Sequence, residues 1–144
     1  MKAASHPFWS RSKFGFHYEK LLKEKIESVI GEPIQKTTYS GDMMDFESKN
    51  YFIELKSRGD QYHYSQAFIK KDGWLLPYCK IDRARKEKAD GKICIFFYFW
   101  TAGRSLWKWD FNEEDLVGCK IEYPPWHQDG QRQIYIPEKC WTQV

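Results

Sequence analysis

An unbroken run of apolar residues, from Ile93 to Phe99, constrains the fold of this chain more than any other feature of its sequence. A strand carries apolar side chains on both faces when other parts of the protein cover both faces. The preceding segment, 75–90, has helical character, with Pro77 suited to its first turn and Gly91 just past its end. A helix that leads into a fully buried strand is typical of a crossover connection. The sequence therefore predicts an α/β fold with a central mixed β-sheet flanked by helices.

Amphipathic and alternating patterns indicate further elements on either side of this unit. Residues 12–30 have the periodicity of a helix, with an N-cap at Ser12 and a stop at Gly31. Residues 41–56 indicate a β-hairpin, because polar residues at 48–50 separate two apolar runs. The remaining expectations are strands at 33–40, 105–111 and 133–136, and a polar loop at 57–73.

The composition is that of a folded domain. The chain has 144 residues, of which 42% are hydrophobic and 18% aromatic, enough for a substantial core. We expect a single domain over residues 1–144, with its core at 12–111 and a β-rich C-terminal extension at 112–144. The net charge of +3 is mildly basic and does not by itself indicate a nucleic-acid-binding protein.

The cysteines and the apolar segments bear on the compartment. The four cysteines lie far apart without a C-x-x-C pair, so the spacing of a zinc ribbon is absent. No N-terminal segment is typical of a signal peptide, and no apolar run approaches the length of a membrane span. We therefore expect reduced cysteines, no membrane partner and an intracellular location, which is cytoplasmic if the chain is prokaryotic or phage-encoded.

The predicted hairpin carries the residues best suited to chemistry. Glu54 and Lys56 are two residues apart on a strand, so they project from the same face. Asp42, on the neighbouring strand, adds a second carboxylate. Two close carboxylates repel each other unless a cation lies between them, and a divalent metal ion is the usual solution. Because an adjacent lysine can polarise a water molecule, these are the parts needed for metal-assisted hydrolysis of a phosphodiester.

The register of the hairpin decides which aspartate joins this face. Asp42 shares strand parity with Met44 and Phe46, whereas Asp45 shares it with Met43. A shift of one residue would exchange the two faces of the strand. Both aspartates are therefore candidates.

An acid followed by E-L-K-S-R at 54–58 resembles the PD-(D/E)xK nuclease superfamily, most closely its archaeal and viral-type Holliday junction resolvases. In this superfamily an acid on one strand and a (D/E)-x-K on the next build a magnesium site. The resolvases also place a glutamate on a preceding amphipathic helix, which is the place of Glu19 here. The resemblance covers residues 12–100 in the order of elements, and Gly41 stands in place of the proline of the motif.

The resemblance implies a restriction-endonuclease-like core and a Mg²⁺-dependent endodeoxyribonuclease, for which Mn²⁺ substitutes. Asp42 and Glu54 would bind the metal ion and Lys56 would hold or polarise the attacking water. Within the superfamily pattern an acid followed by two apolar residues favours Asp42, with Asp45 as the alternative metal ligand. Resolvases act as dimers, so a homodimer acting on branched or duplex DNA is implied. The complete set implied for the site is Glu19, Asp42, Glu54, the backbone carbonyl of Leu55, and Lys56.

Basic residues gather in the predicted helix at 75–90, including Lys80, Arg83 and Lys86. They form either a solvated helix face or contacts with phosphate groups. If the chain is a nuclease, these three residues and Arg58 are the candidates for binding nucleic acid.

Two other functions remain open. Residues 112–144 have no counterpart in the small resolvases, which leaves room for another phage, viral or mobile-element DNA endonuclease. The third candidate is a non-catalytic nucleic-acid-binding module on the same fold. Metal-dependent cleavage separates the two enzymes from the module.

Overall fold

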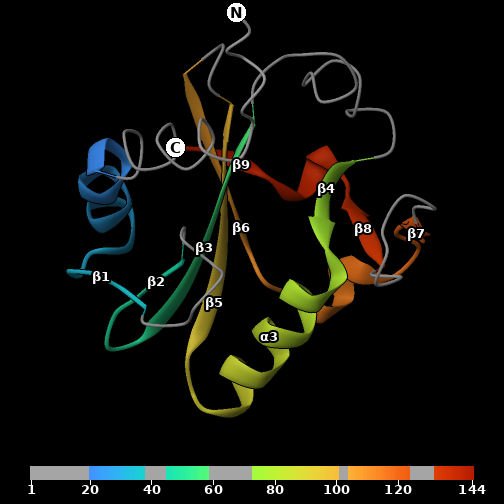
Figure 1. The fold of residues 1–144 in the computed structure, drawn as a ribbon, viewed down its shortest axis with the longest axis horizontal. Coiled ribbons are helices and arrows are strands. Elements are labelled where there is room, and N and C mark those ends of the chain that lie inside the picture. The colour runs from blue at the N-terminus through green and yellow to red at the C-terminus, as the bar shows by residue number, and fades with distance from the viewer. Residues whose placement is uncertain (1–19, 38–44, 59–72, 101–103, 124–131) are drawn as a thin grey trace, which may run out of the picture.

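The central pair of strands, β3 (Tyr51–Arg58) and β5 (Ile93–Trp100), runs parallel with eight residues in each strand (Figure 1). The other neighbouring pairs in this six-stranded sheet are antiparallel, in the order β1-β2-β3-β5-β6-β9. Their bounds are Gln35–Lys36 for β1, Asp45–Glu47 for β2, Ser105–Asp110 for β6 and Thr142–Gln143 for β9. This computed structural model describes residues 20–37, 45–58, 73–100, 104–123 and 132–144.

A second, three-stranded antiparallel sheet lies on one side of the first. Its order is β4-β8-β7, so a strand that precedes the crossover helix pairs with one from the C-terminal part of the chain. The helix α3 (Tyr78–Ala89) follows β4 directly and leads into β5. The remaining bounds are Trp74–Pro77 for β4, Ile121–Glu122 for β7, Gln133–Ile136 for β8, and Glu113–Leu116 and Glu138–Cys140 for the 3₁₀ helices η3 and η4.

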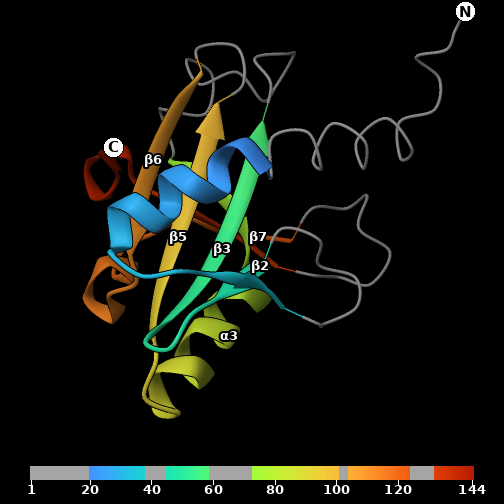
Figure 2. The ribbon, with the colours of Figure 1, turned by 90° about the vertical axis from the view of Figure 1, so that its left-hand side faces the viewer.

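Both faces of the large sheet are covered. The helical segment 20–30 crosses one face of β3 and β5 (Figure 2), where Ile26 packs with Ile53 and Ile95. The helix α3 and the small sheet cover the other face, where Phe52 and Phe96 belong to a separate buried cluster. Successive strand residues point to opposite faces, so each long strand contributes to both apolar layers.

Trp74, on β4 of the small sheet, packs against four other aromatic rings. Its ring lies 5.4 Å from the rings of Tyr98 and Trp100, 5.2 Å from Trp107 and 5.0 Å from Trp141, measured between centroids. Aromatic side chains bury large apolar areas and gain a further contribution from edge-to-face and offset contacts. The high aromatic content of the chain is therefore used, in large part, to join the two sheets.

The structure confirms the α/β class, the mixed sheet and the crossover. Residues 20–30 of the predicted helix are helical and end at Gly31, whose φ is +80°. The hairpin turn falls at the predicted position, where the Ser48 backbone N–H donates to the Tyr51 carbonyl at 2.9 Å. The strand predicted at 133–136 is β8.

Three boundaries differ from those predicted. Residues 75–77 are strand rather than helix, because β4 pairs in register with β8, and α3 begins only at Tyr78. Residues 57 and 58 are strand rather than loop, because β5 pairs with β3 to its end. In the described part of 33–40, the strand covers only Gln35–Lys36. In the first two cases, pairing with a distant segment overrides the local pattern.

All four cysteines are free, as expected: Cys79, Cys94, Cys119 and Cys140. Burial raises the pKa of the Cys119 and Cys140 thiols, and the nearby charge of Asp115 adds to the effect. Within the described ranges, no helix is both long enough and apolar enough to cross a membrane.

Gly73, which precedes β4, offers a sharp test of the contact between β4 and β8. Its φ is +113°, and a Cβ atom there would lie 2.7 Å from the backbone carbonyl carbon and oxygen of Ile136. We expect Gly73→Ala to lower the free energy of unfolding by about 3 kcal/mol, from backbone strain together with overpacking. Urea denaturation measures the change.

Gly118→Ala is the matched control. Its φ is +80°, but nothing lies within 4 Å of the added Cβ, so only the strain of about 1 kcal/mol is expected. Equal losses in the two variants would contradict the close approach of β4 and β8.

Candidate active site between β3 and α3

Glu54 is a buried carboxylate on the central strand β3. The residue is 6% exposed and lies beneath α3, on the same strand face as Phe52. Its Oε2 atom is 3.2 Å from the Nζ atom of Lys80, which comes from the first turn of α3. A buried carboxylate is strongly disfavoured without a compensating cation. The Lys80 ammonium provides such a cation.

A small cavity opens beside this ion pair, where β3, β5 and the junction of β4 with α3 meet. Its volume is about 120 Å³, which is room for a few water molecules. One carboxylate and two ammonium groups reach its lining, so the cavity places a group that binds cations beside two groups that attract anions. The lining residues are Glu54, Leu55, Lys56, Leu76, Pro77, Lys80 and Phe96.

A second cation of α3 also contacts this face of β3. One turn after Lys80, the Arg83 guanidinium lies 4.3 Å from the centroid of the Phe52 ring. Arg83 also pairs with Glu87 at 3.1 Å, four residues later on the same helix. Two of the three helix residues predicted to bind phosphate therefore make contacts inside the protein, and Lys86 is exposed in the last turn.

The environment of Lys80 lowers the pKa of its side chain. Burial disfavours the charged ammonium and the nearby Arg83 repels it, so the pKa of Lys80 falls from 10.5 to about 8. The lysine side chain is 25% exposed, so it reaches solvent as well as the carboxylate.

The hairpin register pairs Asp45 of β2 with Glu54 of β3. Asp45 is the direct cross-strand partner of Glu54 in the antiparallel pair of β2 and β3. Asp42 and Glu19 lie outside the described residues. The described part of the N-terminal helix, 20–30, covers the sheet face opposite to that of Glu54.

Lys56 and Arg58 occupy the second half of β3. Lys56 is half-buried, lines the cavity, and pairs in register with Tyr98 of β5. Arg58 is the last residue of the strand and pairs in register with Trp100. The structure therefore brings Glu54, Lys56 and Lys80 together around one cavity.

Among the described residues around this cavity, Glu54 is the carboxylate that a divalent metal ion would bind. The Lys80 ammonium lies 3.2 Å from its Oε2 atom, so a cation can reach this carboxylate from the α3 side. Among the residues that the structure describes, no group of three or more histidine, cysteine, aspartate or glutamate side chains could hold a metal ion. A site here would need ligands besides Glu54, such as backbone carbonyls and water, which Mg²⁺ commonly uses.

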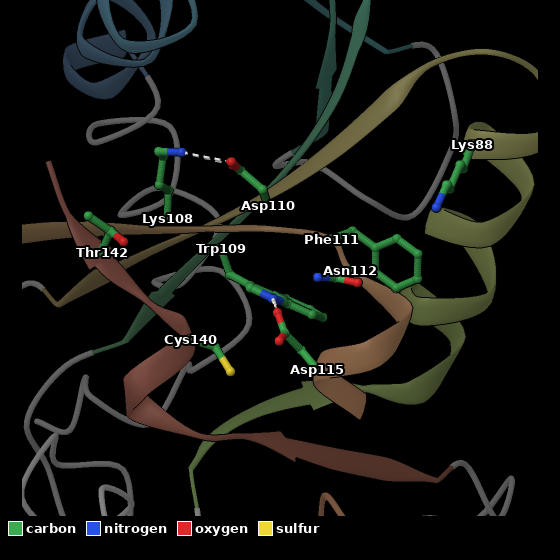
Figure 3. A pocket seen from close by; sticks show the side chains of 9 residues that line it. All are labelled: Lys88, Lys108, Trp109, Asp110, Phe111, Asn112, Asp115, Cys140 and Thr142. Atoms are coloured by element: carbon green, nitrogen blue, oxygen red, sulfur yellow. Dashed lines mark hydrogen bonds and ion pairs between the residues drawn. The ribbon is translucent and has the colours of Figure 1, made fainter. Parts of the chain in front are cut away.

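A larger cavity of about 400 Å³ lies past the other end of α3 (Figure 3). Its polar groups are engaged with one another: the Lys108 ammonium pairs with Asp110 at 2.8 Å, and the Trp109 indole donates to Asp115 at 2.8 Å. Lys108 and Asp110 also lie two residues apart on β6, but the Asp110 side chain is 58% exposed, whereas that of Glu54 is 8% exposed. We therefore place the candidate site at the smaller cavity.

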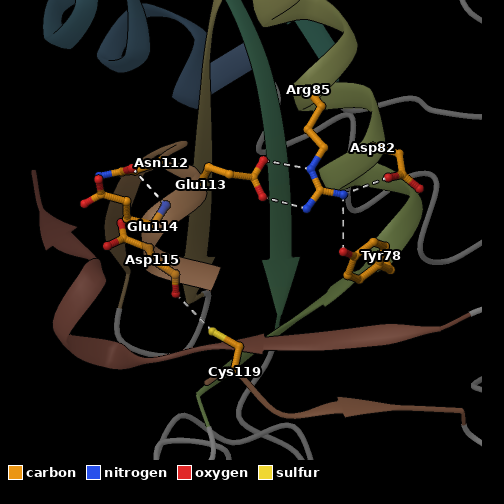
Figure 4. A network of polar contacts seen from close by, with 8 residues as sticks. All are labelled: Tyr78, Asp82, Arg85, Asn112, Glu113, Glu114, Asp115 and Cys119. Atoms are coloured by element: carbon orange, nitrogen blue, oxygen red, sulfur yellow. Dashed lines mark hydrogen bonds and ion pairs between the residues drawn. The ribbon is translucent and has the colours of Figure 1, made fainter. Parts of the chain in front are cut away.

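The guanidinium of Arg85 joins α3 to η3 (Figure 4). It donates to both carboxylate oxygens of Glu113 at 2.8 and 2.7 Å, and also to Asp82 and Tyr78. These hydrogen bonds raise the pKa of Arg85 and lower that of Glu113. The basic stretch of α3 thus serves in part to anchor the helix.

Comparisons of the chain with protein-family models, with curated proteins and with solved structures find no match. The site is therefore interpreted from its own residues.

Sequence reasoning missed the pairing of Lys80 with Glu54. The helix was predicted to begin at residue 75, but the pairing of β4 with β8 delays it to Tyr78, and this start sets which helix residues face the sheet. The signal in the sequence is a lysine in the first helical turn after a short apolar strand. This pattern does not specify Glu54 as the partner of the lysine.

Lys80→Met tests the ion pair. The substitution leaves the Glu54 carboxylate buried without this ammonium, so we expect a loss of roughly 1–3 kcal/mol in the free energy of unfolding. Lys88→Met, an exposed position on the same helix, should cost less than about 0.5 kcal/mol. Urea denaturation at neutral pH measures both.

A double variant separates the pair from general packing. Glu54→Gln removes the charge that Lys80 neutralises. The double variant Glu54→Gln/Lys80→Met should therefore lose less free energy of unfolding than the two single variants lose together. Additive losses would show that the two groups do not interact.

Proposed function

We propose that this chain is a metal-dependent DNA endonuclease that hydrolyses phosphodiester bonds. One observation carries the proposal: a buried carboxylate and two lysines line a single cavity, and the neighbouring strand β2 has an aspartate in register with that carboxylate. Acidic groups that hold a cation, next to ammonium groups that attract a phosphate, are the parts that phosphodiester hydrolysis needs.

The order of elements supports the same proposal. A helix, the β2–β3 hairpin, a crossover through α3 and the parallel strand β5 follow one another along the chain. This is the order that the resemblance to PD-(D/E)xK nucleases implies, and we propose a restriction-endonuclease-like core on that basis. In such a core, Glu54 and Lys56 of β3 would take the place of the (D/E)-x-K motif.

We assign the roles as follows. Glu54 and an aspartate of the preceding strand would hold Mg²⁺ or Mn²⁺, together with the Leu55 carbonyl. A bound metal ion would lower the pKa of a water molecule and stabilise the charge of the transition state. Lys56 would orient the attacking water and offset charge on the scissile phosphate, and Lys80 adds a second positive charge at the cavity.

The hairpin register favours Asp45 over Asp42 as the aspartate of the site. Directly opposed residues of an antiparallel pair lie on the same side of the sheet. Phe46, which is opposite Ile53, belongs with it to the layer beneath helix 20–30. By the same alternation, the next pair along, Asp45 and Glu54, would belong to the layer that contains the cavity.

The substrate is proposed from the motif. The string at 54–58 resembles that of Holliday junction resolvases, which favours branched DNA and a homodimer. The C-terminal residues support a different DNA endonuclease as the second candidate, because β8 and β9 are integrated into the two sheets rather than appended to a small resolvase core.

A non-catalytic DNA-binding module is the candidate from another class. The pairing of Lys80 with Glu54 favours it, because a cation of the protein itself neutralises the carboxylate. Cleavage decides between this candidate and the two nucleases.

The first test compares cleavage of a four-way junction, a linear duplex, a flap and a single strand, with Mg²⁺ or with EDTA. We expect Mg²⁺-dependent cleavage that falls about a hundredfold or more in Glu54→Gln and in Lys56→Met, while DNA affinity is retained. Glu113→Gln, another carboxylate paired with a cation of α3, is the control and should cleave normally. Binding without cleavage in the wild-type protein would establish the module instead.

A pair of isosteric variants tests the register. Asp45→Asn should lose cleavage about a hundredfold, whereas Asp42→Asn should retain most of it, because Asp45 is the direct cross-strand partner of Glu54. The same cleavage assay measures both variants. The reverse result would assign the site to Asp42 and reject the role of Asp45.

A further inference from the structure

The ion pair between Lys80 and Glu54 occupies the place that the proposed metal ion needs. The Lys80 ammonium is 3.2 Å from Oε2 of Glu54, within direct contact distance. A divalent cation on the same carboxylate would lie within a few ångströms of that ammonium. Two cations that close repel strongly in a partly buried site, where the effective dielectric constant is low.

Of the two partners, Lys80 has the better access to solvent. Its side chain is 25% exposed, whereas that of Glu54 is 8% exposed. Lysine has a long, flexible stem that can keep its methylene groups packed while its charged end moves. The adjacent cavity of about 120 Å³, which both residues line, provides space for the ammonium.

We propose that the Lys80 ammonium and a divalent metal ion are alternative partners of the Glu54 carboxylate, so that metal binding displaces Lys80 into the cavity. Lys80 thus acts as an internal cation that keeps Glu54 neutralised in the metal-free protein. This inference rests on the proposed function, since it concerns the same carboxylate. It adds a positioning residue that neither the E-x-K motif nor the hairpin contains.

The exchange has a thermodynamic consequence. A ligand that must displace a bound group binds more weakly than it would at a vacant carboxylate. Removing the ammonium should therefore increase the affinity for the metal ion. Loss of a residue that helps to bind the metal ion would decrease that affinity.

Calorimetric titration with Mn²⁺ tests the exchange in the full chain. We expect Lys80→Met to bind Mn²⁺ about tenfold more tightly than the wild-type protein. Lys88→Met, which removes the same charge from an exposed position about two turns further along α3, should bind as the wild-type protein does. Glu54→Gln should weaken binding about a hundredfold.

Two results would separate failure of the exchange from failure of the proposed function. Equal Mn²⁺ affinity in Lys80→Met and wild type, with binding still dependent on Glu54, overturns the exchange and leaves the nuclease proposal standing. Absence of Mn²⁺ binding in the wild-type protein overturns both.

A second measurement needs no variant and so does not depend on the folding of Lys80→Met. Acetylation of lysines by an N-hydroxysuccinimide ester, read by peptide mass spectrometry, reports the accessibility of each amine. Saturating Mg²⁺ should increase acetylation of Lys80 several-fold and leave Lys88 unchanged. Unchanged acetylation of Lys80 at saturating Mg²⁺ would overturn the exchange.

Discussion

The parallel pairing of β3 with β5 is the constraint on which the rest of the structure depends. The two strands are in register over their whole length, and β5 is buried from Cys94 to Trp100. A strand pair of this kind must be covered on both faces, since each face carries apolar side chains that contribute about 25 cal/mol for every Å² buried. Helix 20–30 covers one face, and α3 with the small sheet covers the other.

This double cover determines the chemistry of the candidate site. Glu54 lies on the strand face beneath α3, so its carboxylate is buried and is held in place by a cation from the helix. The same helix directs Arg83 to the ring of Phe52 and Arg85 to Glu113. The basic stretch of α3, which the sequence suggests as a phosphate-binding surface, therefore serves largely to dock the helix. Its Lys80 ammonium is the group that lines the small cavity.

Much of the fold was predictable, because the decisive patterns are strong and local. The apolar run at β5, the turn after Glu47 and the alternation at β8 each specify an element through residues close in sequence. The strand β4 was not predictable: three of its four residues look like the start of α3, and only pairing with β8, more than fifty residues away, makes them a strand. Short apolar segments take the structure of the partner that they meet.

For the candidate site, the sequence by itself determined that Glu54 and Lys56 share one face, because alternation is a local property of an extended backbone. It also determined that a helix rich in cations follows further along the chain. The tertiary structure alone decided that Asp45 is opposite Glu54 and that Lys80 neutralises its carboxylate. Strand register and helix docking depend on contacts between distant segments, and a shift of one residue in either would bring different side chains to the same place.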